Sequence, residues 1–432
     1  MSWPDGIVNV NKFHYMRGGS ERYYFDLAEI LRGHGHRVVA FSMAHASNVA
    51  PAGPARFVPE VRWGERRGGV RALATLGHII HSRTAARAMD ELLQSDGVDL
   101  AHLHNISHQI SPSILAPLRR RGATVVQTLH DYKLICPNYR LFTEGAPCER
   151  CRGGRYWNAL LHRCNRGETM GSLAIAIESS VHRATDTYAR GVDLFIAPSE
   201  FLMRKAIAFG VPAERLRHIP YPMQLPPLDP ETGRAGGPGN DAAGAPFFLY
   251  TGRLAPEKGI MTLLKAAERV PEATVVIAGD GELREDVRAR ASRLARVQLV
   301  GHKGRDEVVR LQRAALSVVV PSEWYENLPL AVMEAHAAAT PVIGARIGGI
   351  PEMIEEGRTG WLFPPGDDAT LADCLRAALR DPARARAMGV AGRAWVADRY
   401  DPARHYDAIH AAYEDARAFA RAKSSWRWGH AA

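Results

Sequence analysis

The sequence predicts an α/β protein built from two doubly wound, parallel-sheet domains, and three observations lead to this prediction. Short apolar, β-branched runs alternate with amphipathic stretches in the first half of the chain and again in the second half. The chain has 432 residues, of which 46% are hydrophobic, which is enough for two cores and too much for one ordinary domain. Residues 223–245, between the halves, are rich in Pro, Gly and small polar residues, as is typical of an interdomain linker.

The first predicted domain covers residues 1–222. Its expected strands are residues 7–10, 38–41, 100–103, 124–128 and 194–197. Amphipathic stretches such as Glu21–Arg32 separate them and predict helices. The chain closes with another helical pattern, and we expect residues 402–432 to pack back on this first domain.

The second predicted domain covers residues 246–401. Its expected strands are residues 247–250, 274–278, 297–300, 316–320 and 342–345. Polar or glycine-containing residues follow each of these runs. Because open parallel sheets bind their ligands beyond the carboxyl ends of the strands, we expect the polar tips of both domains to face one cleft.

Composition narrows the classes of function. Lys and Arg number 55 against 46 Asp and Glu, so the surface should attract the phosphates of nucleotides or of anionic lipids. No apolar run is long enough to span a membrane, and the first residues lack the pattern of a signal peptide, so we expect a cytoplasmic protein. The many Ala and Arg residues are typical of genomic composition bias, and no nucleic-acid partner is expected.

The most informative stretch is the loop and helix between the fourth and fifth strands of the second domain. Pro329 is expected at the first helical position, which leaves backbone N–H groups near Asn327 and Leu328 available to an anion. Glu326 lies in the loop, and Glu334 lies about 12 Å further along the helix axis. Two carboxylates so placed can hold the two ends of an extended ligand, although two solvated glutamates would leave the same pattern.

Two cations and two glycine turns belong to the same end of the predicted sheet. Arg253 and Lys258 lie between the first strand of this domain and its next helix, where they can hold a diphosphate from two sides. A pair of solvated cations on a loop is the ordinary alternative. Gly279 and Gly301 end the next two strands, in turns that need backbone freedom.

The order and spacing of these motifs resemble the family 4 retaining glycosyltransferases of the GT-B fold. The motifs are GRLAPEKG, AGDG, PSEWYENLPLAVMEA and GGIPEMIEEGRTG in the second half, with GGSERYYFDLAEILRGHGHRV and LHDY in the first. The resemblance implies two Rossmann-like domains, the first binding an acceptor and the second a nucleotide-sugar donor. It also implies transfer, with retention, from a UDP-, GDP- or ADP-sugar to a saccharide or lipid-linked acceptor in surface polysaccharide or glycolipid synthesis.

The resemblance also assigns roles to individual residues. It places the donor diphosphate at Arg253 and Lys258, the donor sugar at Glu326, Asn327 and Leu328, the ribose at Glu334, further donor contacts at Gly18, Gly19, Gly279 and Gly301, and His130 beside the transferred sugar. Catalysis is expected to need no metal, because the cations and the helix N-terminus can stabilise the departing diphosphate. Ala339, where a glycine often stands, and the pair Leu328-Pro329 depart from the family pattern.

Other functions fit part of the sequence. A dinucleotide-dependent oxidoreductase needs three glycines directly after the first strand, whereas Gly18 and Gly19 come later in the chain and lack the third. A GT-B epimerase or phosphorylase, or a non-catalytic relative that binds sugar nucleotides, would keep the same donor motifs. Release of nucleoside diphosphate only when an acceptor is supplied distinguishes a transferase from these alternatives.

Four of the five cysteines lie close together in the sequence, and they are Cys136, Cys148, Cys151 and Cys164. In a chain without an export signal, such a group suits a tetrahedral thiolate site better than disulfides. We therefore expect a structural zinc ion beside the LHDY motif. Four free thiols in a loop are the alternative.

A basic and apolar stretch suggests where the protein works. Leu73, Leu76 and Ile80 recur at helical spacing after the arginines Arg62, Arg66, Arg67 and Arg71. Each cation near an anionic leaflet contributes about 1 kcal/mol, so we hypothesise peripheral attachment to the inner face of the cytoplasmic membrane. A helix packed on the first sheet explains the apolar positions equally well.

Overall fold

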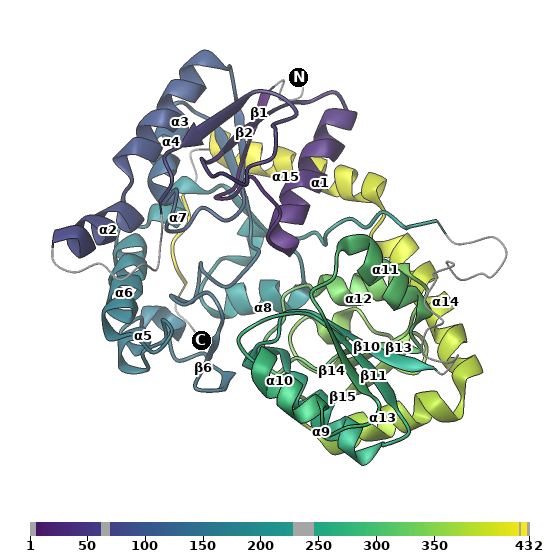
Figure 1. Ribbon diagram of the computed structural model, residues 1–432. Coiled ribbons are helices and arrows are strands. Elements are labelled where there is room, and N and C mark those ends of the chain that lie inside the picture. The colour runs from purple at the N-terminus through teal and green to yellow at the C-terminus, as the bar shows by residue number, and fades with distance from the viewer. Residues whose placement is uncertain (1–5, 62–69, 228–245, 423–424, 430–432) are drawn as a thin grey trace. The chain divides into compact units, whose positions relative to one another are not determined.

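The computed structural model describes residues 6–61, 70–227, 246–422 and 425–429. The chain forms two compact units (Figure 1). Unit 1 comprises Met1–Thr143, Cys148–Pro222 and Pro402–Ala432, and unit 2 comprises Glu144–Pro147 and Met223–Asp401. Each unit has its own parallel sheet.

The sheet of unit 1 has seven strands in the order β3-β2-β1-β4-β5-β8-β9, and all its neighbouring strands are parallel. The strands are β1 (Gly6–Val10), β2 (Arg37–Met43), β3 (Ala55–Val58), β4 (Leu100–Leu103), β5 (Thr124–Thr128), β8 (Leu194–Ala197) and β9 (Leu216–His218). The chain moves outward from β1 to β3 and then resumes on the other side at β4. The order therefore reverses between β1 and β4, which is where open sheets of this kind bind ligands.

Helices cover both faces of this sheet. They are α1 (Gly19–Gly33), α2 (Val70–Ile80), α3 (Arg83–Ser95), α4 (Leu115–Arg120), α5 (Asn158–Leu161), α6 (Thr169–Ala184), α7 (Thr187–Gly191), α8 (Glu200–Ala208) and α15 (Pro402–Arg421). α1 packs with α15, and α4 packs with α3 and α7 (Figure 1). α15 is held by buried polar contacts as well as apolar ones, since the hydroxyl of Tyr413 lies 2.7 Å from Nδ1 of His102 on β4.

The sheet of unit 2 has six parallel strands in the order β12-β11-β10-β13-β14-β15. The strands are β10 (Phe247–Thr251), β11 (Thr274–Ala278), β12 (Val297–Gly301), β13 (Ser317–Val320), β14 (Val342–Ala345) and β15 (Gly360–Phe363). The helices are α9 (Ile260–Arg269), α10 (Arg284–Ala291), α11 (Arg305–Ala314), α12 (Leu330–Ala337), α13 (Asp368–Arg380) and α14 (Pro382–Arg399). α9 packs with α10 and α13, while α12 packs with α11 and α14 (Figure 1). Here the strand order reverses between β10 and β13.

All ten predicted strands are present, and the predicted fold class is confirmed in its two parallel-sheet units. Besides the two-residue strands β6 (Phe142–Thr143) and β7 (Ala146–Pro147), the strands that were not predicted from the sequence are β3, β9 and β15. These are short strands at sheet edges, two of them partly exposed, where the apolar signal is weak. One helix start is also corrected: Pro329 is extended (φ −71°, ψ 109°), so α12 begins one residue later, at Leu330.

The membrane hypothesis falls mostly on residues that the structure does not describe. Arg62, Arg66 and Arg67 lie outside the described residues. The helical pattern that follows them is confirmed as α2, which packs on α6. No helix in the described ranges is both long and apolar enough to cross a membrane.

A strained residue follows α12. Ala339 has φ of +58°, in the left-handed region that glycine occupies without strain, and its N–H donates to the carbonyl of His336 over 2.9 Å. This is the position where the family pattern often has glycine, so the departure noted in the sequence carries a conformational cost.

We predict that Ala339→Gly raises the free energy of unfolding of unit 2 by about 1 kcal/mol, because it removes the left-handed strain of a residue with a Cβ. Urea denaturation measures the change. The matched control is Ala338→Gly, at the preceding residue with φ of −80°. There glycine should lower stability by about 0.5–1 kcal/mol. Equal effects of the two substitutions would contradict this interpretation.

Candidate functional site

Two loops of unit 2 meet at the point where its strand order reverses. The loop after β10 carries Lys258, and the loop after β13 carries Ser322 and Glu326. The ammonium of Lys258 donates to Oε1 of Glu326 over 2.7 Å, and the hydroxyl of Ser322 donates to the same oxygen over 2.7 Å. Glu326 is only 6% exposed. A largely buried ion pair therefore joins the two loops.

The charge state of Glu326 follows from this contact. Burial alone would raise its pKa, but the positive charge of Lys258 and the hydrogen bonds from Lys258 and Ser322 outweigh burial and lower the pKa below its usual value. The carboxylate is therefore ionised at neutral pH. The ammonium of Lys258 also lies 5.0 Å from the ring centroid of Trp324, which adds a cation–π contact.

Arg253 has a carboxylate partner that the sequence analysis did not single out. Its guanidinium donates to Oε1 of Glu257 over 2.8 Å, and Glu257 is only 1% exposed whereas the side chain of Arg253 is 60% exposed. The backbone carbonyl of Glu257 also accepts from the N–H of Glu323 over 2.9 Å, which ties the two loops together a second time. The only sequence signal was an acidic residue four positions after Arg253.

Close backbone approach explains two glycines of this site. Gly259 has φ of +66°, and a Cβ there would lie 1.8 Å from the carbonyl oxygen of Pro321. Gly348 has φ of +62°, and a Cβ there would lie 2.4 Å from the carbonyl oxygen of Glu326. Only glycine lets these segments approach without displacing the backbone.

The other predicted donor residues of unit 2 lie at the same end of the sheet or on α12. The N–H of Gly279, after β11, donates to the carbonyl of Gly301, at the end of β12, over 2.9 Å. Leu328 is buried, Asn327 is half-buried just before α12, and Glu334 is half-buried within α12. The structure thus brings Lys258 and Glu326 into contact and joins Gly279 to Gly301, while the ribose role of Glu334 stays a prediction.

In unit 1, the half-buried His130 belongs to a series of buried and partly buried hydrogen bonds at the carboxyl ends of the central strands. Oδ1 of Asn9, on β1, lies 2.8 Å from Nε2 of His104, which follows β4. Nδ1 of His104 lies 2.8 Å from Nε2 of His130, which follows β5. Nδ1 of His130 lies 2.6 Å from the hydroxyl of Tyr221. The sequence predicted only His130 of this series, because Asn9 and His104 look like ordinary positions in or beside buried strands.

The orientation of the Asn9 amide fixes the direction of each hydrogen bond in this series. The side-chain amide of Asn9 donates to the carbonyl of Tyr24 over 3.0 Å, so its oxygen faces His104 and accepts. His104 therefore donates from Nε2 and accepts at Nδ1, His130 donates from Nε2, and Tyr221 donates to Nδ1 of His130. Burial lowers the pKa of His130 to about 3, with a further contribution from Lys12. The imidazoles of His104 and His130 are both neutral at neutral pH, and each is held in one tautomer.

The predicted phosphate contacts of unit 1 lie at the start of α1. Gly18 is the residue before the helix, and Gly19 is its first residue. Glu21 lies in the first turn, is only 4% exposed, and accepts a hydrogen bond from the Ser20 hydroxyl over 3.0 Å. This carboxylate already occupies the positive end of the helix dipole, so phosphate binding at Gly18 and Gly19 stays a prediction.

The zinc prediction at Cys136, Cys148, Cys151 and Cys164 is not supported. In the described part of the chain, no group of three or more His, Cys, Asp and Glu side chains could hold a metal ion, and the cysteines are free thiols. The thiol of Cys136 donates to Oδ1 of Asn138 over 2.9 Å. Burial raises the pKa of Cys136 to about 11, which keeps this thiol protonated. The four cysteines nevertheless lie near one another, since burial and the neighbouring Cys136, Cys164 and Cys148 raise the pKa of Cys151.

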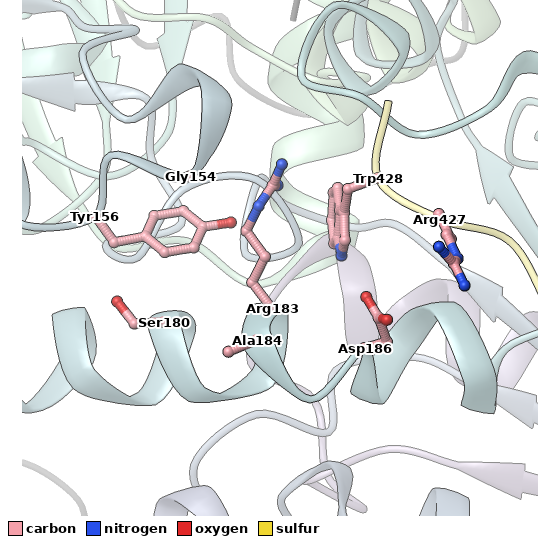
Figure 2. Close-up of a pocket in the computed structure, with 8 residues that line it drawn as sticks. All are labelled: Gly154, Tyr156, Ser180, Arg183, Ala184, Asp186, Arg427 and Trp428. Atoms are coloured by element: carbon pink, nitrogen blue, oxygen red, sulfur yellow. The ribbon is translucent and has the colours of Figure 1, made fainter. Parts of the chain in front are cut away.

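A pocket of about 490 Å³ in unit 1 contains none of the predicted site residues (Figure 2). It is lined by Gly154, Tyr156, Ser180, Arg183, Ala184, Asp186, Arg427 and Trp428. The guanidinium of Arg183, on α6, lies between Tyr156 and Trp428, 4.4 Å from the Trp428 ring centroid. The N–H of Gly429 donates to the carbonyl of Gly210 over 2.8 Å. These contacts hold the C-terminal segment against unit 1.

Comparisons with known proteins decide the family. The family described as "Glycosyl transferases group 1" matches residues 239–395, and "Glycosyltransferase Family 4" matches residues 17–224. The chain belongs to the family 4 glycosyltransferases. It is 35% identical to the sulfoquinovosyl transferase of Arabidopsis thaliana over 36% of this chain and 31% of that protein. It is 30% identical to a GDP-mannose-dependent phosphatidylinositol monomannoside mannosyltransferase of Mycolicibacterium smegmatis over 46% of this chain and 55% of that protein.

The similarity to solved structures spans almost the whole chain. The crystal structure of Anabaena HepE in complex with UDP and glucose has a TM-score of 0.64 and 18% identity, and covers 95% of this chain and 100% of that one. At this identity the comparison concerns the fold, and it confirms the predicted GT-B class. This chain spans only about a third of the length of the Arabidopsis protein and about half of the length of the mycolicibacterial protein.

We predict that acid destabilises unit 1 through its neutral histidines. The pKa of His130 is lowered on folding to about 3, so its stabilising contribution is complete above its ordinary pKa of about 6.5 and is lost as the pH falls from there towards 3. Each such histidine should remove about 1.4 kcal/mol per pH unit in that window.

Urea denaturation at about pH 7.5 and about pH 5.5 measures this loss. His130→Asn should reduce the pH dependence, while the same substitution at the exposed His34 should leave it as it is. If both variants showed the pH dependence of the unsubstituted chain, the neutral state of His130 would be refuted.

Proposed function

We propose that this protein is a retaining, metal-independent glycosyltransferase that moves a sugar from a nucleotide-diphosphate sugar to an acceptor hydroxyl. The observation that supports this most is the joined pair of loops in unit 2, where Lys258, Glu326 and Arg253 lie beyond the carboxyl ends of β10 and β13. We assign donor binding to unit 2 and acceptor binding to unit 1. Family membership supports the reaction class.

The charge arrangement suits a diphosphate. Each of the two cations is held by a carboxylate, Lys258 by Glu326 and Arg253 by the buried Glu257. The carboxylates fix the positions of the cations before the ligand arrives, so less reorganisation is needed when the phosphates bind. As the bond from the sugar to the phosphate breaks, negative charge develops on the diphosphate, and cations held in this way stabilise it without a metal ion.

In the sugar-transfer step, unit 1 would supply neutral hydrogen-bonding groups, whereas unit 2 would supply charged ones. A neutral, fixed imidazole can donate or accept a hydrogen bond but does not readily take up a proton, and the pKa of His130 is far below neutrality. We therefore propose that His130 positions the transferred sugar and that the departing phosphate accepts the proton from the acceptor hydroxyl. Tyr221 and His104 hold the ring in place for this task.

For the donor we propose a UDP-sugar first and a GDP-sugar second. The structure of the similar Anabaena protein contains UDP and glucose, and the name of the mycolicibacterial relative specifies GDP-mannose. For the acceptor we propose a saccharide on a lipid carrier or a glycolipid, because the name of that relative specifies a phosphatidylinositol mannoside. This acceptor would place the enzyme at the inner face of the cytoplasmic membrane.

We predict that Glu326→Gln and Glu334→Gln impair different steps, sugar transfer in the first variant and UDP binding in the second. Glu326→Gln should chiefly lower the rate of sugar transfer, at least about tenfold, because the carboxylate orients Lys258 beside the reacting phosphate. Glu334→Gln should instead weaken UDP binding, because the resemblance places this carboxylate on the ribose. Single-turnover transfer from UDP-glucose and calorimetric titration with UDP measure the two effects.

The matched control is Glu285→Gln, an exposed glutamate of α10 paired with Arg288, which should change neither measurement. Equal UDP affinity in Glu334→Gln and the unsubstituted protein would refute the ribose assignment. Steady release of UDP from UDP-glucose without any acceptor would refute transfer as the main reaction. Inversion at the anomeric carbon of the product, seen by NMR, would refute the retaining mechanism.

A further inference from the structure

A second series of hydrogen bonds in unit 1 attaches α15 to the sheet and to α1. Nδ1 of His405, on α15, lies 2.9 Å from the carbonyl oxygen of Pro220, and its Nε2 lies 3.2 Å from the hydroxyl of Tyr23 on α1. Thr128, at the end of β5, hydrogen-bonds to the same hydroxyl, and its own oxygen lies 2.7 Å from Nε2 of His102 on β4. None of the four side chains is more than 5% exposed.

The direction of each hydrogen bond in the second series is fixed. A carbonyl can only accept, so Nδ1 of His405 carries the proton. Burial lowers the pKa of His405 to about 4, so its Nε2 carries no proton at neutral pH and accepts from the Tyr23 hydroxyl. Tyr23 then accepts from Thr128, which accepts from Nε2 of His102. The Tyr413 hydroxyl, also on α15, donates to the remaining nitrogen of His102.

The second series reaches His130 through Tyr221. His405 holds the carbonyl of Pro220, and Tyr221 is the next residue. The Tyr221 hydroxyl donates to Nδ1 of His130 over 2.6 Å. The ring of Tyr23 lies 4.5 Å from the ring of Tyr221 and 5.5 Å from that of His130, measured between centroids. The placement of the His130 ring therefore depends on groups of α1 and α15.

Apolar packing already holds α15 in place. Ile409, Ala412 and Ala416 of this helix are buried. Buried polar groups cost free energy unless each of them is paired, and a fully paired series favours a single arrangement. The second series therefore adds precision of position to a helix that apolar contacts already dock.

We propose that His405 is a positioning residue for sugar transfer, which holds His130 against the transferred sugar through Pro220 and Tyr221. The proposal rests on the proposed function, because the contact between His130 and the sugar is taken from it. It adds a residue of the C-terminal helix to the machinery of unit 1. A purely structural role of His405 would change the stability of the protein and leave the rate of transfer by the folded protein unchanged.

Two substitutions of His405 separate its two hydrogen bonds. His405→Asn keeps an amide N–H near the place of Nδ1, so the Pro220 carbonyl stays held. His405→Gln keeps an acceptor near the place of Nε2 and releases the carbonyl. In single-turnover transfer from UDP-glucose, His405→Gln should lower the rate about tenfold and His405→Asn less than about threefold, because small misplacements of a positioning group slow the reaction. UDP affinity, measured by calorimetric titration, should change in neither variant.

A double substitution tests whether His405 acts through Tyr221. Tyr221→Phe removes the hydrogen bond to His130, so adding His405→Gln to Tyr221→Phe should lower the rate by less than about twofold more. Independent, additive losses would overturn the proposal. Tyr23→Phe removes only the hydroxyl that bonds to Nε2 of His405 and should lower the rate about threefold. This variant is compared with the unsubstituted chain if His405→Gln does not fold.

Nitrogen NMR of the histidine-labelled full chain provides a readout that needs no activity. The signal of His130 Nδ1, identified by its absence in His130→Asn, reports the hydrogen bond from Tyr221. His405→Gln should shift this signal, and His405→Asn should keep it. The matched control is His410→Gln, at a half-buried histidine of the same helix whose ring contacts Tyr406. It should change neither the signal nor the rate.

An unshifted His130 signal and an unchanged rate in His405→Gln would overturn the proposal. Equal losses of rate in His405→Gln and His405→Asn would overturn it as well, because the bond to Pro220 would then not matter. If the unsubstituted chain transfers no sugar, the proposed function is refuted, and the NMR comparison still decides whether His405 holds His130. If that chain transfers sugar and His405→Gln does so equally fast, this inference alone is refuted.

Discussion

The ion pair between Lys258 and Glu326 is the interaction on which the arrangement of unit 2 depends. The strand order of this unit reverses between β10 and β13, so the elements that follow these strands diverge to opposite faces of the sheet. The reversal creates room for a ligand, but it also leaves the two loops without the packing that a continuous layer of helices provides. The ion pair, at 2.7 Å, and the backbone bond from Glu323 to Glu257 restore the connection. The close approach at Gly259 makes both contacts possible.

Each unit has one reversal of strand order in its sheet, but the groups that lie at the reversal differ in charge. Unit 2 places charged groups at its switch point, which suits phosphates. Unit 1 places there, beside Lys12, a hydrogen-bonded series of neutral groups from Asn9 through His104 and His130 to Tyr221, in which burial keeps the imidazoles uncharged. Neutral, oriented groups suit a sugar that must be held without being protonated. This difference is the physical basis of the separate roles proposed for Lys258 and His130.

The sequence predicted the strands well wherever burial dictates the residue type. Central strands such as Thr124–Thr128 and Thr274–Ala278 need β-branched residues on both faces and were found with their observed bounds, whereas three of the four edge strands of the two parallel sheets were missed. Lys258 and Glu326 were predictable because charged residues in the loops that follow buried strands are conspicuous. Glu257 and His104 were not, because a buried polar residue becomes meaningful only when its partner is known. The zinc prediction has no support in the described part of the chain, where no group of side chains that could hold a metal ion is found.

The central claim is that Lys258, held by Glu326, binds the donor diphosphate, and calorimetric titration of UDP into the Lys258→Met protein tests it most directly. Methionine keeps the length of the side chain and removes its charge. Loss of a charge-assisted contact to a phosphate should weaken UDP binding at least about tenfold. The same substitution at the neighbouring Lys265, on α9, serves as the control and should leave UDP binding unchanged. Unchanged UDP affinity in Lys258→Met would contradict the account, because the ion pair would then serve only to stabilise the loops.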